Sequence, residues 1–85
     1  MEDLEFEPHA RVELARDSVS QDEVYHVVGD ADIEYERNDG RTRHERMMDD
    51  GRLLVVIVED AIRMVRTVWW DKRNSRMRRR RSRWQ

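Results

Sequence analysis

The chain contains no cysteine, which excludes disulfide bonds and thiolate metal sites. It has only three glycines, too few for a glycine-rich phosphate loop or a nucleophile elbow. Its three histidines lie far apart in the sequence and show no ligand spacing, so we expect no metal and no cofactor. The longest apolar run, residues 53–58, is too short to cross a bilayer, and the acidic N-terminus does not resemble a signal peptide. We therefore expect a cytoplasmic protein with no membrane contact.

Acidic residues are nearly absent from the C-terminal end. Residues 71–85 hold 8 Lys/Arg and one Asp, a balance of +7, whereas residues 1–70 hold 9 Arg and 18 Asp/Glu, a balance of −9. This segregation predicts an acidic domain over residues 1–70 and an arginine-rich basic tail over residues 71–85. A core in a chain of 85 residues supplies little net stability, so a homodimer is a further expectation.

Two helices are indicated between residues 8 and 29. Leu4 and Phe6 alternate with acids and predict a short first strand, after which Pro8 fits the first turn of a helix. Residues 20–23, Ser-Gln-Asp-Glu, form a capping box for a second helix, and Gly29 stands where such a helix ends.

From residue 31 onward the apolar residues alternate, which predicts four antiparallel strands. Turns are indicated at Asn38-Asp-Gly40, at Asp49-Asp-Gly51 and at residues 59–60. Residues 53–58 are apolar on both faces and predict a central strand, and residues 62–70 predict the last one. The expected fold is α+β, in the order β-α-α-β-β-β-β, an antiparallel sheet with two helices packed on one face.

Two stretches of the sequence carry a resemblance to known families. "PHARVELARDSVSQDEV" resembles the opening of a small prokaryotic domain-of-unknown-function family, number 4258. "GRLLVVIVEDAIRMVRTVW" resembles the closing hairpin of the BrnT-type toxins. Both groups are similar to the RelE and barnase-like ribonuclease toxins, and the resemblance spans residues 6–70. Where the first family often has an arginine, this chain has Glu13, whereas Arg16 matches the next basic position.

The resemblance implies RNA cleavage without a metal, for which three side chains are candidates. Such cleavage needs a base for the 2′-hydroxyl proton and cations for the charge that grows on the phosphate. His9, at a helix N-terminus that disfavours the protonated ring, is the candidate base, and Arg43 and Arg63 are the candidate cations. His44 ranks lower because it faces away from Arg43 in a strand. The alternatives are a helix-start role for His9 and pairing with carboxylates for the two arginines.

The tail adds candidates for nucleic-acid binding. Arginine-rich segments with polar spacers bind RNA phosphates and stack on bases, and an exposed Trp69 at the end of the last strand can also stack. The alternatives are a tail that folds back onto the acidic domain and a Trp69 that packs on the sheet or on a protein partner. The candidate nucleic-acid-binding residues are Trp69, Arg73, Arg76, Arg78, Arg79, Arg80, Arg81 and Arg83.

Three functions therefore stand as hypotheses. The first is a RelE/BrnT-like endoribonuclease toxin with RNA as its substrate and an antitoxin-like protein as its partner. The second is a non-catalytic module of the same fold that binds RNA or protein through its tail and sheet surface. The third is a homodimeric interaction protein.

Overall fold

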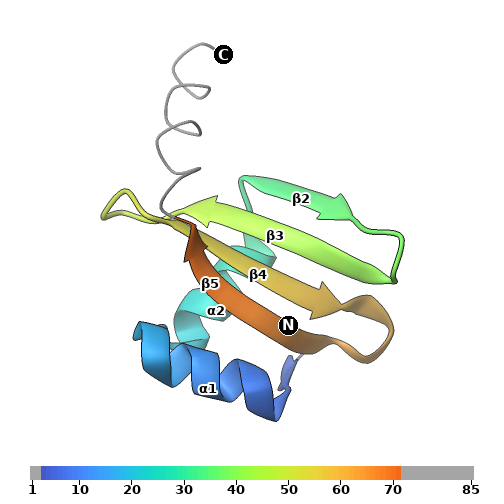
Figure 1. Cartoon of the computed structure of the whole chain (residues 1–85). Helices are drawn as coiled ribbons and strands as arrows, with labels where there is room; N and C mark the ends of the chain where they lie inside the picture. Colours follow the sequence, from blue (N-terminus) through green and yellow to red (C-terminus); the bar gives the residue numbers. More distant parts are fainter. Residues whose placement is uncertain (1–2, 72–85) are drawn as a thin grey trace.

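A computed structural model describes residues 3–71 and shows an α+β fold with two helices and a five-stranded sheet (Figure 1). The elements are β1 (Glu5–Phe6), α1 (Pro8–Asp17), α2 (Gln21–Gly29), β2 (Ile33–Glu36), β3 (Arg41–Met47), β4 (Leu53–Glu59), the short 3₁₀ helix η1 (Asp60–Ile62) and β5 (Met64–Asp71).

The sheet is mixed, with strand order β1-β5-β4-β3-β2. Strands β2 to β5 pair in the expected antiparallel manner, and β4, which is apolar over residues 53–58, is central, as its sequence predicts. The expectation of a wholly antiparallel sheet is wrong at β1, because Glu5 and Phe6 pair parallel with Met64 and Val65 of β5. A parallel pair needs a long connection, and here both helices and three strands separate β1 from β5.

Local signals in the sequence account for the ends of most elements. The capping box is present, since Ser20 Oγ accepts from Glu23 N and Glu23 Oε1 accepts from Ser20 N. Gly40 and Gly51 adopt positive φ angles of 81° and 86° in the two predicted turns. The last strand begins later than its pattern predicts, because residues 60–62 form η1 and Arg63 then takes a left-handed conformation.

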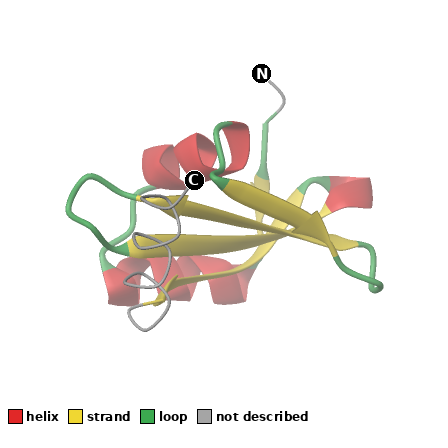
Figure 2. Ribbon diagram, turned by 90° about the horizontal axis from the view of Figure 1, so that it is seen from above, coloured by secondary structure: helices red, strands yellow, loops and turns green. Residues whose placement is uncertain are grey.

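The core lies between the sheet and its two helices. One face of β4, with Leu54, Val56 and Val58, joins apolar residues of both helices in one buried cluster, so both helices pack on this face. Helix α1 contacts β5, and α2 contacts β3 and β4. The sheet is twisted (Figure 2). The opposite face, called here the open face, has a smaller buried group of Leu53, Val55 and Ile57.

Glu13 links helix α1 to strand β5 through hydrogen bonds. Its side chain is buried, and its Oε1 accepts hydrogen bonds from Thr67 Oγ1 at 2.8 Å and from the Val68 backbone N at 3.1 Å. Strand β1 pairs with the first two residues of β5 only, so this carboxylate satisfies an edge N–H that β1 does not reach.

Among residues 3–71, no helix is long and apolar enough to span a membrane.

Candidate functional site

A cavity of about 330 Å³ lies on the helix-covered side of the sheet. Leu4, the end of α2 (Tyr25, Val28 and Gly29) and strands β2 and β3 line it, and η1 with the residue after it closes one side. Its volume is near the lower end of the range for small-ligand pockets. Its polar lining residues are Tyr25, Glu34, Thr42, His44, Asp60 and Arg63.

His44 lines this cavity and supplies its imidazole group. It is paired with Val56 in the sheet, so it faces the helices, and it is only 6% exposed. Its Nδ1 lies 3.2 Å from Glu34 Oε2 on the neighbouring strand, in an orientation that does not meet hydrogen-bond geometry. Burial lowers the pKa of His44, and the nearby Arg63 lowers it further, while the carboxylates of Glu34 and Asp60 oppose the shift. The lowered pKa favours the neutral form of the ring.

The other polar groups are held by short contacts. Thr42 Oγ1 donates to Asp60 Oδ2 at 2.7 Å, which ties β3 to η1. The Tyr25 hydroxyl oxygen accepts a hydrogen bond from Leu4 N at 2.9 Å. Because that contact uses the oxygen as an acceptor, the hydroxyl proton stays available for donation.

Arg63 brings a guanidinium to the same cavity from a constrained backbone position. It follows η1 with φ 52° and ψ 43°, a left-handed conformation that few residues other than glycine adopt. Backbone positions of this kind often occur at functional sites. Among the three predicted catalytic residues, Arg63 alone lines the cavity.

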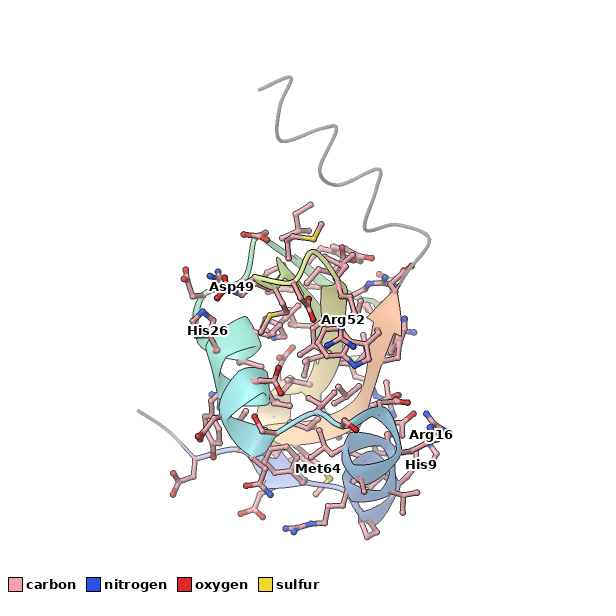
Figure 3. The ribbon with its side chains drawn as sticks, turned by 90° about the vertical axis from the view of Figure 1, so that its left-hand side faces the viewer. His9, Arg16, His26, Asp49, Arg52 and Met64 are labelled. Carbon is pink, nitrogen blue, oxygen red and sulfur yellow. The ribbon has the colours of Figure 1, made fainter. Side chains whose placement is uncertain are left out.

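His9 lies elsewhere, on the outer surface of α1. Its side chain is 67% exposed, and its Nε2 lies 3.6 Å from Glu13 Oε2, one helical turn further on. Figure 3 shows it close to Arg16 on α1, and Arg16 Nη2 also contacts Glu13, at 3.7 Å. No cavity-lining residue comes from α1. The structure therefore does not bring His9 to the cavity that holds Arg63.

Arg43 lies on the open face, across the sheet from the cavity. Its Nε contacts Glu45 Oε2 at 2.6 Å and its Nη2 lies 3.8 Å from Asp71 Oδ2. Its guanidinium carbon is 5.9 Å from the Tyr35 ring centroid and 5.1 Å from that of Trp69. Arg43 therefore pairs with carboxylates, which was the alternative to a catalytic role. Trp69 packs on the open face of the sheet, which was the alternative to stacking on a base.

The predicted nucleic-acid contacts Arg73, Arg76, Arg78, Arg79, Arg80, Arg81 and Arg83 lie outside the described residues. Within residues 3–71, no group of three or more His, Cys, Asp or Glu side chains is arranged to hold a metal ion.

The cavity residues left a weak signal in the sequence. The cavity residues Thr42 and His44 alternate along β3, together with Arg46 outside the cavity, on the face that the helices cover, where apolar residues are usual. Polar side chains at inward positions mark either a buried network or a site, and the sequence alone does not show which residues oppose them. Comparison of the chain with protein-family models, curated proteins and solved structures finds no match.

Proposed function

We propose that this protein is a metal-independent endoribonuclease that cleaves RNA in the cavity around His44 and Arg63. The observation that carries the proposal is the presence in one cavity of a neutral imidazole, a guanidinium and a hydroxyl with a free proton. These are the base, the cation and the acid that such cleavage needs. A RelE/BrnT-like toxin fold and role, with an antitoxin-like partner, are consistent with this chemistry and belong to the same proposal.

In the proposed reaction, His44 accepts one proton and Tyr25 donates another. The negative charge of Glu34 Oε2, 3.2 Å from Nδ1 of His44, attracts a proton to that nitrogen without a well-aligned hydrogen bond, which leaves Nε2 to accept the 2′-hydroxyl proton of RNA. The 2′-oxygen then forms a bond to phosphorus, and Arg63 stabilises the charge on the non-bridging oxygens. The bond to the 5′-oxygen breaks, and that oxygen takes the proton of Tyr25. The products are a 2′,3′-cyclic phosphate and a 5′-hydroxyl, and the His44 proton restores Tyr25.

The test is cleavage of a single-stranded RNA oligonucleotide by the purified full chain in the presence of a chelator. We expect His44→Gln and Arg63→Gln each to reduce the rate about 100-fold or more, because each removes a group that acts on the reacting atoms. His9→Gln is the matched control, since His9 lies outside the cavity, and it should keep the wild-type rate. Circular dichroism should show that all three variants remain folded.

Two results would contradict the proposal. One is loss of cleavage in His9→Gln together with full activity in His44→Gln. The other is absence of cleavage by the wild-type chain under any of these conditions.

A second candidate function is a non-catalytic module that binds RNA or protein. It is favoured by the grouping of Arg43 with two aromatic rings on the open face, since its guanidinium carbon lies 5.9 Å from the Tyr35 centroid and 5.1 Å from the Trp69 centroid. RNA that binds to the full chain and is recovered uncut would support this function over the first.

A further inference from the structure

Strand β2 has an open edge among the described residues. It is the last strand in the sheet order, and only β3 pairs with it. Arg37 N donates to Arg41 O on β3, and alternate residues of a strand direct their backbone groups to the same side. The N–H and C=O groups of Glu34 and Glu36 therefore point away from β3 and can pair with a further strand.

The side chains along this edge define the charge of a strand that would fit it. Glu34 and Glu36 lie on the helix-covered face and are exposed, as are Asp32 and Asp39 at the two ends of β2. Tyr35 projects to the open face and is 45% exposed. Arg37 is the only basic residue between residues 30 and 39. The edge therefore suits an extended segment with cationic side chains on both of its faces.

The C-terminal segment of the chain has this composition and starts within reach. Strand β5 ends at Asp71, opposite Leu53, at the same end of the sheet where β2 begins. Four strand spacings separate β5 from a strand added outside β2, about 19 Å. The six residues 72–77 can span about 20 Å, so the four consecutive arginines 78–81 can lie along β2.

We propose that residues 78–81 of the same chain bind to the open edge of β2 as an additional strand, parallel to β2. Alternation then places two of the four arginines beside the carboxylates of Glu34 and Glu36, and the other two on the face of Tyr35. Binding within one chain is favoured by the high effective concentration of a short connection. The proposal does not depend on catalysis in the cavity.

Disulfide trapping tests the proposal, because the chain has no cysteine of its own. The double variant Arg37→Cys/Ser82→Cys places one thiol beside the edge of β2 and the other just after the four arginines. The matched control is Val12→Cys/Ser82→Cys, since Val12 is 63% exposed on α1. We expect the first pair to form an intramolecular disulfide about tenfold faster than the control at low salt. Adding Glu36→Gln to the first pair should slow its formation.

The products are read as bands on a non-reducing gel. Equal rates in the two double variants would show that the tail samples the surface without preference, and would overturn the proposal. A disulfide-linked dimer as the main product would also overturn it, because the segment would then bind a second copy. The trapping is done without RNA, so its outcome does not depend on RNA cleavage, and failure of either proposal leaves the other intact.

Discussion

At the scale of single residues, His44 shows how a polar side chain can be placed inward in a small core. It is nearly buried, it lies beside Glu34, and Arg63 and Asp60 also face the cavity. Burial lowers the pKa of His44, so the folded protein holds this proton less tightly than the unfolded chain does. Protonation of His44 therefore favours unfolding.

This linkage predicts a loss of stability in weak acid. The stabilising contribution of neutral His44 is present above the ordinary histidine pKa of about 6.5 and is lost as the pH falls toward the lowered pKa. The free energy of unfolding in urea, measured between about pH 7.5 and 5.5, should fall more in the wild type than in His44→Gln. An equal fall in the two proteins would show that His44 does not contribute to the pH dependence.

At the scale of elements, the attachment of α1 to β5 depends on one carboxylate. Glu13 accepts two hydrogen bonds from β5 and also contacts His9 and Arg16 on its own helix. The contact joins α1 to the edge of the sheet through a buried acceptor.

Glu13→Ala should therefore destabilise the protein by about 1–3 kcal/mol, because it leaves the buried Val68 N–H without its acceptor. Urea unfolding gives this value directly. Glu13→Gln keeps one side-chain oxygen as an acceptor and should cost less. Val12→Ala, at an exposed neighbouring position, is the control and should change little. A loss in Val12→Ala as large as that in Glu13→Ala would contradict the role given to the carboxylate.

At the scale of the whole molecule, the sequence divides into an acidic domain and a basic tail. The balance of −9 over residues 1–70 repels a phosphodiester backbone, so any RNA bound by this chain depends on the +7 of residues 71–85. The open edge of β2 and RNA would then compete for the same arginines.

The dependence of RNA affinity on salt measures the contribution of the tail. If the tail engages about five phosphates, the slope of log K against log salt for single-stranded RNA is about −3.5. Replacing Arg79 and Arg81 with glutamine should make this slope shallower by up to about 1.4. Arg11→Gln on α1 is the control and should leave the slope unchanged. A slope that is the same in all three proteins would show that the tail does not bind RNA.

The sequence by itself determined most elements of this protein. The capping box at Ser20, the turns at Gly40 and Gly51 and the apolar run of β4 act over a few residues, so their outcome could be predicted without a fold. Alternation along β3 also determined that Arg43 and His44 face opposite sides of the sheet.

Only the tertiary structure decided which side chains meet. The parallel pairing of β1 and the position of η1 depend on contacts between residues that are far apart in the sequence. For the same reason Arg63 shares a cavity with His44 and not with His9, although His9 had the clearer signal at a helix start. Local patterns set the direction of a side chain within its own element, and packing between elements sets what that side chain faces.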